Sequence, residues 1–347
     1  MKALVYHGPQ RRTWEEVPEP ELKDPEDVIV GVDAVTLCGT DLHILGGDVA
    51  TAEPGRVLGH EAVGTVQETG PGVRTLHVGD RVLISCISAC GRCRYCRQAR
   101  YGQCLGGGGW VLGNRIDGTQ AERVRVPFAD TSTYALPAAL SDEPALLLAD
   151  ILPTSYEVGI RNGCVSPGDT VVIVGAGPVG LAAVATARLL SPACIVVIDP
   201  AAPRRAAAGR LGADVLLASA DEAVERVAEL AGGLGADVTV EAVGRPETFD
   251  LCVRLTRPGG HVANIGVHGA PAALHLESIW DRNLTITTGL VDTYSTPTLL
   301  TMVESGQLDL SALVTHRFGL EEMQEAYDAF SHPADTGALK VALFNTR

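Results

Sequence analysis

Basic residues are scarce in this chain. Lysine and arginine number 27 against 42 aspartates and glutamates, which gives a formal net charge of −15 over 347 residues. A protein that binds a nucleic-acid backbone must neutralise phosphates with a lysine- or arginine-rich surface. The shortage therefore argues against nucleic acid as a partner, and the arginine cluster between Arg92 and Arg100 is too small to reverse that conclusion.

The sequence also lacks a targeting segment and a membrane-spanning run. It opens MKALVYH, without a charged segment followed by an apolar one, so nothing predicts secretion. The uncharged stretch 171–187 approaches the ~20 residues that a membrane helix needs, but glycines and a proline divide it into a short β run and a helix. We expect no membrane partner and a cytoplasmic protein.

Length and composition predict a globular protein of two domains. At 347 residues the chain is too long for one ordinary core, and 46% hydrophobic with 20% charged residues is typical of globular proteins. Up to about residue 150, short strands between glycine and proline turns predict an irregular β domain. From about 152 to 291, β runs alternate with helices, which predicts an α/β doubly wound parallel sheet. The predicted domains are 1–151 with 292–347, and 152–291.

Four cysteines form the clearest motif. Three of them are spaced three residues apart and the fourth follows eight residues later, an arrangement that can surround one tetrahedral ion. Thiolates bind zinc at about 2.3 Å, and the loops between them are short enough for the lobe 86–105 to converge on it. The pattern predicts a closed structural zinc site held by Cys90, Cys93, Cys96 and Cys104.

A pair of disulfides is the alternative interpretation of these cysteines. It is the weaker one, because nothing predicts secretion and the nine cysteines of the chain are an odd number. We also expect the interleaved arginines to favour the thiolate forms. Since a closed four-thiolate site has no open position for a substrate, we expect neither catalysis nor redox sensing there.

A dinucleotide-binding motif opens the second half. Gly175, Gly177 and Gly180 form GxGxxG between the β run 170–174 and an apolar helix. The first glycine turns the chain, the second admits a pyrophosphate against the backbone, and the third allows close packing of helix and strand. The motif alone is weak evidence, but its position between strand and helix makes a plain glycine turn the poorer interpretation.

Asp199 follows Gly180 by 19 residues, at the end of the next β run. A carboxylate there accepts hydrogen bonds from the adenosine ribose and repels a 2′-phosphate, so the pattern favours NAD over NADP. Arg204 and Arg205 lie just beyond it and could hold a phosphate instead. We give the carboxylate more weight because its position discriminates better.

Two upstream clusters could hold a second metal ion. The segments 38–43 (CGTDLH) and 59–61 (GHE) supply a thiol, a histidine and carboxylates, the donors that an open catalytic zinc uses. Buried cysteines and histidines are common without a metal. Asp150 strengthens the case, because it lies in an apolar run where an unpaired carboxylate is costly to bury. A helix-end aspartate is the alternative, since Pro153 marks an element boundary.

With these motifs the chain resembles the zinc-dependent medium-chain alcohol dehydrogenases over nearly all of its length. The shared motifs, in order, are CGTDxH at 38–43, GHE at 59–61, GDRV at 79–82, the four cysteines and GxGxxG. The resemblance implies a GroES-like catalytic domain and a Rossmann NAD-binding domain. Asp150 stands where alcohol dehydrogenases with a two-cysteine, one-histidine zinc site have their second cysteine, as in the bacterial secondary-alcohol branch.

The same resemblance implies roles for individual residues. It implies two zinc ions per chain, with the catalytic one held by Cys38, His60 and Asp150 and transiently by Glu61. It assigns proton relay to Thr40 and His43, and a histidine suits the outer end because it titrates near the working pH. It places Gly266, Val267, Leu290 and Val291 along the nicotinamide and Thr154 near the reactive end of the cofactor. Pro178 and Val179 within the glycine motif, and Arg204 beyond Asp199, are further expected cofactor contacts. Ile87 and Trp110 correspond to substrate-pocket walls, although plain core packing is the alternative for both. His268 departs from the usual apolar residue and receives no role.

The sequence thus predicts a zinc-dependent oxidoreductase, an alcohol dehydrogenase and carbonyl reductase, that transfers hydride between NAD(H) and small alcohols or their aldehydes and ketones. A polyol or amino-alcohol dehydrogenase of the sorbitol or threonine type stays open, and so does a cofactor-binding module without catalysis, because a fold does not guarantee chemistry. We expect a homo-oligomer, tetramer rather than dimer, since the segment 283–290 corresponds to a strand that pairs across subunits in relatives.

Overall fold

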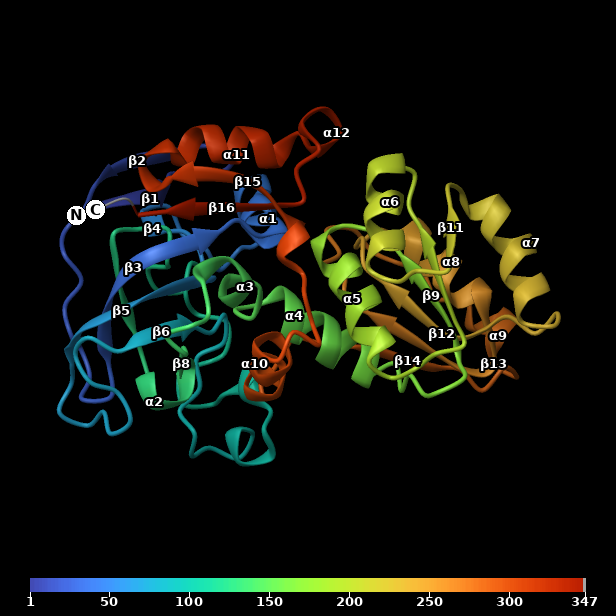
Figure 1. Ribbon diagram of the computed structural model, residues 1–347, viewed down its shortest axis with the longest axis horizontal. Helices are drawn as coiled ribbons and strands as arrows, with labels where there is room; N and C mark the ends of the chain where they lie inside the picture. Colours follow the sequence, from blue (N-terminus) through green and yellow to red (C-terminus); the bar gives the residue numbers. More distant parts are fainter. Residues whose placement is uncertain (346–347) are drawn as a thin grey trace. The chain divides into compact units, whose positions relative to one another are not determined.

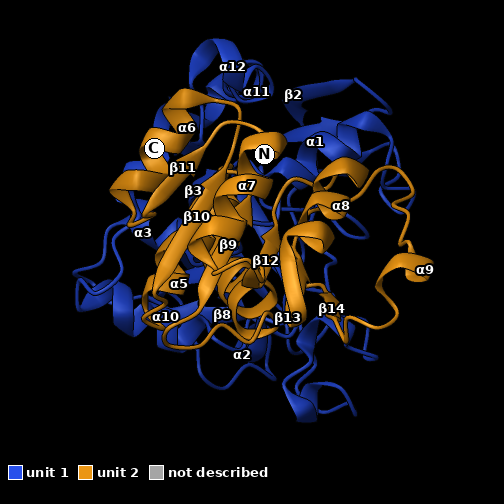
Figure 2. Cartoon of the chain, turned by 90° about the vertical axis from the view of Figure 1, so that its right-hand side faces the viewer, with its two compact units in different colours: residues 1–150, 291–347 blue, residues 151–290 orange. Residues whose placement is uncertain are grey.

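The computed structural model describes residues 1–345, and the chain divides into two compact units (Figure 1, Figure 2). Unit 1 comprises Met1–Asp150 and Val291–Arg347, and unit 2 comprises Ile151–Leu290. The boundaries expected from the sequence lie one residue from these divisions. The C-terminal tail lies in the same unit as the N-terminal half.

Unit 1 is built on two β-sheets. One has the strand order β2-β1-β4 and the other the order β15-β16-β3-β5-β6-β8, with β7 also paired to β3. Their bounds are β1 Lys2–Tyr6, β2 Arg12–Glu16, β3 Val28–Thr36, β4 Arg56–Val57, β5 Ala62–Thr69, β6 Arg81–Ile84, β7 Arg123–Val126, β8 Thr133–Ala135, β15 Val314–Gly319 and β16 Lys340–Phe344. Strand β3 is buried along nearly its whole length and pairs with β16, β5 and β7, and its β-branched residues suit that position.

Short helices complete unit 1. They are α1 Gly39–Gly46, α2 Ala129–Ser132, α3 Asp142–Leu147, α10 Thr296–Glu304, α11 Met323–Ser331 and α12 Pro333–Thr336, with 3₁₀ turns at Cys96–Gln98, Tyr101–Gln103, Ser311–Leu313 and Leu320–Glu322. Helix α11 is amphipathic: Met323, Ala326, Tyr327 and Phe330 repeat at helical spacing and are buried in the main core of the unit. This packing brings a tyrosine from near the end of the chain into the same core as β3 and β5.

Unit 2 is a six-stranded parallel sheet with the order β11-β10-β9-β12-β13-β14. Numbered from β9, this order is 3-2-1-4-5-6, the order of the dinucleotide-binding Rossmann fold. The strands are β9 Thr170–Val174, β10 Cys194–Ile198, β11 Val215–Leu217, β12 Ala236–Glu241, β13 Thr256–Asn264 and β14 Thr285–Thr288. The predicted doubly wound parallel sheet is therefore confirmed.

Helices of unit 2 cover both faces of that sheet (Figure 2). They are α4 Ile151–Thr154, α5 Pro178–Arg188, α6 Ala202–Arg210, α7 Ala220–Leu230, α8 Pro246–Leu255 and α9 Leu276–Ile279, with a π-helical segment at Ser155–Arg161. Alternate side chains of β9, Val172 and Val174, share a core with Val227 of α7 and Leu251 of α8. Because strand side chains alternate between faces, the intervening residues of β9 face the other helical layer.

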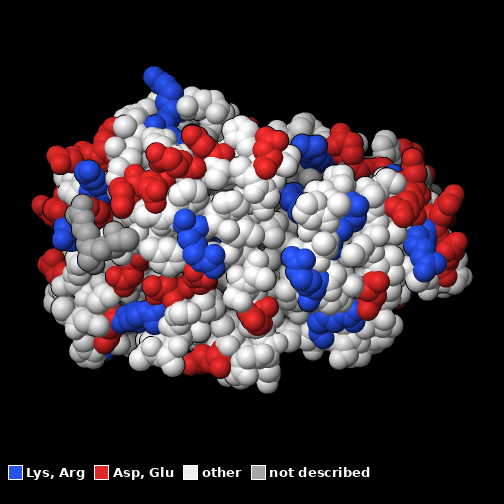
Figure 3. Space-filling view, turned by 45° about the horizontal axis from the view of Figure 1, so that its top comes forward, with Lys and Arg blue, Asp and Glu red and all other residues white. Residues whose placement is uncertain are grey.

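The uncharged stretch 171–187 forms β9 and most of α5, which confirms the strand-turn-helix prediction. Within residues 1–345, no helix has both the length and the apolar character needed to cross a bilayer. On the face drawn in Figure 3, lysine and arginine side chains lie singly or in small groups among acidic ones. This pattern agrees with the net charge of −15.

Candidate metal centres and dinucleotide site

The four cysteines of unit 1 converge on one point. One sulfur from each of Cys90, Cys93, Cys96 and Cys104 lies within 4.8 Å of all the others. The Sγ atoms of Cys93 and Cys96 are 3.4 Å apart and those of Cys90 and Cys96 are 3.9 Å apart, well beyond the roughly 2.05 Å of a disulfide. All nine cysteines of the chain are free thiols. The donor set of four thiols in one cluster fits a tetrahedral structural zinc ion.

Backbone N–H groups favour the thiolate form of Cys93 in this lobe. Hydrogen bonds from the backbone, including that of Leu105 at 3.4 Å, lower the pKa of Cys93 to about 6. Burial raises the pKa of Cys96 to about 12. Arg92 instead pairs with Glu26 at 2.7 Å. The expectation that the interleaved arginines favour the thiolates stays a prediction.

A second cluster of ligand-type residues lies at the ends of β3 and β5. The antiparallel register pairs Val35 with Ala62, so Cys38 just after β3 meets His60 and Glu61 just before β5. Asp150 lies between α3 and α4, and the neighbouring peptide is fixed by a hydrogen bond from Cys86 N to Ala149 O at 3.1 Å. One atom from each of Cys38, His60, Glu61 and Asp150 lies within 4.8 Å of the others. The structure thus brings together the four residues that the sequence proposed for a reactive metal.

The distances within this cluster suit a shared cation. Asp150 Oδ2 lies 3.5 Å from both Cys38 Sγ and His60 Nε2. Burial raises the pKa of the Cys38 thiol, and the neighbouring Glu61 and Asp150 carboxylates raise it further. Burial also raises the pKa of Glu61, although Lys340 opposes the shift. Acidic groups crowded in a dry site favour a divalent cation, which reverses these shifts, and the thiolate, imidazole and carboxylate donors fit zinc with an open position.

The pKa of His60 is also shifted by the groups crowded around it. Burial lowers this pKa, but hydrogen bonds to Asp150 and Cys38 raise it well above its ordinary value. On its other side, Nδ1 of His60 lies 3.6 Å from Oδ1 of Asp41. Asp41 also accepts a hydrogen bond from the Cys38 backbone N–H at 3.0 Å, which closes the capping box of α1. One carboxylate therefore fixes both the start of α1 and the ring of a metal-site histidine.

Glu61 is held by a fully buried ion pair. Lys340 of β16 donates from Nζ to Glu61 Oε2 at 2.5 Å and to Leu37 O at 3.0 Å, and the Thr36 hydroxyl donates to the same glutamate oxygen. Among residues 1–345, the second oxygen, Oε1, has no hydrogen-bond partner. Glu61 is thus anchored through one oxygen, and the other is available to a cation in the cluster.

The predicted proton relay begins beside the metal cluster. Thr40 Oγ1 lies 3.6 Å from Cys38 Sγ, and His43 stands one helical turn further along α1. The Nδ1 atom of His43 lies 3.0 Å from Oδ2 of Asp48. That carboxylate holds the Nδ1 proton and leaves Nε2 for exchange.

The glycine loop of unit 2 has the form that the motif requires. Gly175 has a φ of +99°, in the left-handed region that favours glycine. A Cβ on Gly177 would meet no atom within 4 Å, which leaves the backbone open to a ligand. A Cβ on Gly180 would overlap the carbonyl oxygen of Gly175, so only glycine permits this packing of helix on strand. Pro178 and Val179 form the first turn of α5.

Asp199 lies just after β10, as the sequence predicted, and it is buried. Its Oδ2 accepts a hydrogen bond from Ala176 N in the glycine loop at 2.8 Å, and its Oδ1 accepts one from Ala201 N at 2.8 Å. Arg204 Nη1 lies 4.0 Å from Oδ2, while Arg205 donates to the backbone oxygen of Asp199. The acidic side chain is thus fixed at the loop, and Arg204 lies within reach of it.

The remaining predicted cofactor residues are spread over both units. Gly266 and Val267 follow β13, at the carboxyl edge of the sheet where nucleotides bind in such folds. Thr154 ends α4, and Leu290 is the last residue of unit 2. Val291 is buried and belongs to unit 1.

Of the two predicted pocket residues, Trp110 lies beside the metal cluster. Its ring packs edge-on against His60 with 6.0 Å between the ring centroids. Ile87 is 1% exposed and adjoins Cys86, whose Sγ lies 3.6 Å from Asp150 Oδ1. His268, unassigned from sequence, contacts Asn264 Oδ1 through Nε2 at 2.9 Å.

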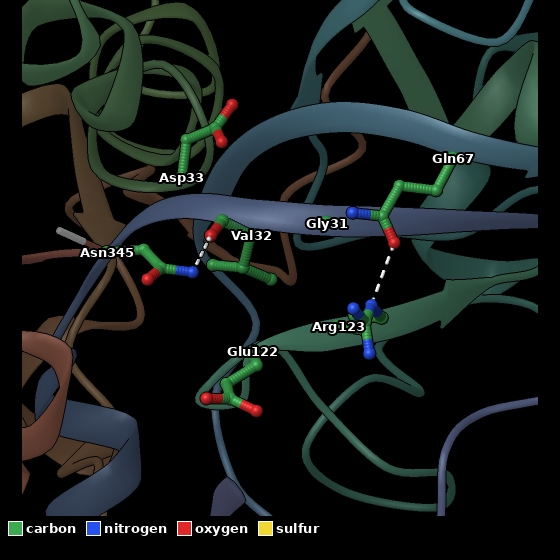
Figure 4. A pocket seen from close by; sticks show the side chains of 7 residues that line it. All are labelled: Gly31, Val32, Asp33, Gln67, Glu122, Arg123 and Asn345. Atoms are coloured by element: carbon green, nitrogen blue, oxygen red, sulfur yellow. Dashed lines mark hydrogen bonds between the residues drawn. The ribbon is translucent and has the colours of Figure 1, made fainter. Parts of the chain in front are cut away.

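A surface hollow of about 190 Å³ lies elsewhere in unit 1, around β3 (Figure 4). It is lined by Gly31, Val32, Asp33, Gln67, Glu122, Arg123 and Asn345. Its polar groups bond one another: Arg123 donates to Gln67 at 2.9 Å and Asn345 donates to the Val32 carbonyl at 3.0 Å. None of the predicted site residues lines this hollow, so we place the chemistry at the metal cluster.

Sequence reasoning missed the outer partners of the ligands. Asp41 lies inside the CGTDLH motif, and Cys86 begins the segment 86–105, but neither has an expected role from sequence. No local motif identifies Lys340, because its partner Glu61 is 279 residues away in the chain. The available signal is a lysine at the start of an otherwise apolar β-like segment, KVALF, which suggests a buried partner of opposite charge.

Known proteins match the chain in both halves. Residues 24–138 match the family model described as Alcohol dehydrogenase GroES-like domain, and residues 178–305 match the model described as Zinc-binding dehydrogenase. An alcohol dehydrogenase of Cupriavidus necator is 35% identical, with 99% of this chain and 98% of that protein covered.

Solved structures agree over the full length. The zinc dependent alcohol dehydrogenase 2 from Streptococcus pneumonia is 45% identical with a TM-score of 0.96, covering 100% of this chain and 99% of that one. The alcohol dehydrogenase TADH from Thermus sp. ATN1 is 38% identical with a TM-score of 0.91, covering 99% and 100%. The similarity spans both units and includes the cysteine lobe.

Proposed function

Because the chain belongs to the zinc-dependent alcohol dehydrogenases of the medium-chain dehydrogenase/reductase superfamily, we propose that it interconverts small alcohols and their aldehydes or ketones with NAD(H). The cluster of Cys38, His60, Glu61 and Asp150 in unit 1 carries this proposal. Three protein ligands, a thiolate, an imidazole and a carboxylate, would leave the fourth position of a bound zinc ion open for a substrate oxygen. The four-cysteine lobe would hold the second, structural zinc ion.

The protein residues would bind the ion and move a proton. A bound zinc ion would supply Lewis acidity that makes the alcohol hydroxyl acidic near neutral pH, and a bound nicotinamide would supply the hydride acceptor. Cys38, His60 and Asp150 would hold the ion, and Oε1 of Glu61 would offer it a further oxygen. Thr40 Oγ1, beside the cluster, would accept the hydroxyl proton, and His43 would take up a proton at the outer end of the relay while Asp48 holds its ring. The reverse sequence reduces a carbonyl.

We propose NAD rather than NADP as the cofactor. The Asp199 carboxylate, fixed beside the glycine loop, would accept hydrogen bonds from the adenosine ribose and repel a 2′-phosphate. The neighbouring Arg204 supports the weaker, opposite preference. Gly177, with open space at its Cβ position, would admit the pyrophosphate.

A panel of alcohols and ketones assayed with NAD(H) and NADP(H), together with metal analysis, tests the proposal. We expect about two zinc ions per chain and NADH formation that stops when a chelator removes the more labile ion. A polyol or amino-alcohol preference would appear in the same panel, but the apolar Trp110 ring beside His60 favours simple alcohols. Tight NAD binding without turnover of any alcohol or carbonyl would indicate a non-catalytic module instead.

The relay has its own test. His43→Ala should slow turnover, chiefly at low pH, and added imidazole or buffer should restore part of the rate. A pH profile identical to that of the wild type would remove His43 from the relay.

We also propose a homo-oligomer, a tetramer rather than a dimer, in the cytoplasm. Strand β14 is the terminal strand of the sheet in unit 2, and Leu274, Leu276 and Trp280 nearby are 39%, 61% and 78% exposed. An exposed strand edge beside large apolar side chains is suited to pairing with another copy. The nine free thiols fit a reducing compartment.

A further inference from the structure

We propose that Gln120 and Tyr327 are positioning residues for the metal-binding histidine. A chain of buried polar groups leads from Tyr327 through Gln120 and Asp41 to His60. The Tyr327 hydroxyl donates to Gln120 Oε1 at 2.8 Å, and Gln120 Nε2 donates to Asp41 Oδ2 at 3.0 Å. The inference rests on the proposed function, because it gives His60 a metal to bind.

The geometry leaves each group one role. Asp41, Gln120 and Tyr327 are all 0% exposed, and groups buried this deeply are costly unless they are hydrogen-bonded. A glutamine amide has one acceptor end and one donor end. The hydroxyl of Tyr327 occupies the acceptor end, so the amide must present its N–H₂ to Asp41. Without that hydroxyl, the buried Oε1 loses this donor, and the position of the amide opposite Asp41 is less tightly fixed.

Asp41 passes this orientation to the metal site. Its Oδ1 and His60 Nδ1 are 3.6 Å apart, which is an ion-pair distance rather than a hydrogen bond, and neither atom has a hydrogen-bond partner among the described residues. Gln120 and the Cys38 N–H hold the other oxygen, so Oδ1 is directed at the ring. A carboxylate on Nδ1–H fixes the tautomer in which the opposite nitrogen is a lone-pair donor, and here that nitrogen faces Asp150.

Distant segments of unit 1 build this chain of contacts. Asp41 comes from α1, Gln120 from the loop before β7, and Tyr327 from α11. At the outer end, the Arg12 guanidinium lies 4.6 Å from the centroid of the Tyr327 ring. The C-terminal helix thereby supports a metal ligand that is 267 residues earlier in the sequence.

The experiment compares Tyr327→Phe and Gln120→Leu with the wild type in the full-length enzyme. The affinity of the labile zinc ion is measured by competition with a chelator, and the visible spectrum is recorded with Co²⁺ in that site. Removing a partner of a metal-bound histidine typically weakens metal binding about 10- to 100-fold, and we expect Tyr327→Phe at the lower end of that range with a shifted Co²⁺ spectrum. In an Asp41→Asn background the same substitution should have little further effect, because the connection is already broken.

Tyr134→Phe is the matched control, since it removes a tyrosine hydroxyl of unit 1 that donates to the Thr293 carbonyl at 2.9 Å and belongs to β8, not to the segments that carry Tyr327, Gln120 and Asp41. Zinc affinity and the Co²⁺ spectrum should not change there. Tyr327→Phe keeps the aromatic ring in the core, so it should fold even if Gln120→Leu does not. Unchanged zinc affinity and an unchanged spectrum in Tyr327→Phe would overturn this inference and leave the proposed function intact. A wild-type enzyme that holds only one zinc ion per chain would instead contradict the proposed function on which it rests.

Discussion

At the scale of single residues, Cys86 occupies a position that its scattered place in the sequence conceals. Its thiol lies 3.6 Å from Oδ1 of Asp150, while Oδ2 of the same carboxylate faces Cys38 and His60. Burial raises the pKa of Cys86 well above the ordinary value, so it remains an S–H donor at neutral pH. The thiol therefore holds one oxygen of Asp150 and leaves the other for the cation.

Replacing Cys86 tests this arrangement. Cys86→Ala removes the donor and should lower the affinity for the labile zinc ion about 10-fold, as loss of an outer partner of a metal ligand usually does. Cys86→Ser retains a donor and should stay closer to the wild type. Chelator competition measures both affinities, and equal losses in the two variants would mean that packing, not the hydrogen bond, matters at this position.

The second prediction at this scale concerns Asp199 and the choice between NAD and NADP. Asp199→Gly should lower kcat/KM for NAD at least about 10-fold and shift preference toward NADP, because the ribose acceptor and the repulsive charge are both lost. Asp199→Asn keeps the size and an acceptor for the Ala176 N–H and removes only the charge. Paired kinetics with both cofactors measure the change; an unchanged preference in both variants would refute the role of the carboxylate.

At the scale of elements, the lobe 86–105 depends on four sulfurs and very little regular structure. Apart from two short 3₁₀ turns it has no helix, and its sulfurs accept hydrogen bonds from the N–H groups of Cys90, Leu105 and Gly106. The apolar core of such a segment is too small to keep it folded when the metal ion is lost. Cys93→Ser should therefore release one zinc ion and reduce stability or assembly before it affects chemistry, and a stable but inactive variant would contradict this.

The pH dependence of the lobe follows from the Cys93 thiol. Because its pKa is lowered to about 6, the thiolate contribution is fully present above the ordinary thiol pKa of about 8.5 and is lost as the pH falls through about 6. In metal-stripped protein, alkylation of Cys93 should be half-maximal near pH 6, whereas Cys96, with a pKa of about 12, should react only in strong base. Peptide mapping of the alkylated protein distinguishes the two sites, and matching profiles would contradict the assignment.

At the scale of the whole molecule, the two units would carry different parts of the proposed reaction. Unit 1 contains the candidate metal ligands, and unit 2 contains the glycine loop and Asp199. Each unit has its own hydrophobic core. Assembly into oligomers, by contrast, would depend on the terminal strand β14 and the exposed apolar residues of unit 2.

Substituting one of those residues tests the assembly. Trp280→Glu places a charge on a side chain that is 78% exposed, and it should convert the oligomer to smaller species if the surface is an interface. Val78→Glu, on a residue of unit 1 that is 65% exposed, is the matched control and should leave the mass unchanged. Light scattering after size-exclusion chromatography gives the mass, and an unaltered oligomer in Trp280→Glu would place the interface elsewhere.

The sequence by itself determined the elements and the donor types. GxGxxG, the run 170–174 and the spacing of Asp199 are local signals, so the dinucleotide unit could be predicted and was confirmed as a parallel sheet. The four cysteines were predictable for the same reason, since short loops leave them one way to converge. The identity of Cys38, His60 and Asp150 as one cluster needed a family resemblance in addition to their chemistry.

Only the tertiary structure decided what surrounds those ligands. Asp41 contacts both the Cys38 N–H and the His60 ring because the start of α1 lies against His60. Lys340 reaches Glu61 because β16 pairs with β3. Gln120 and Tyr327 meet across 207 residues of sequence. Partners so far apart leave no periodicity or spacing in the chain, since strand register and helix packing alone set their distance. The sequence specified which groups could bind a metal ion, and the fold specified which groups hold them in place.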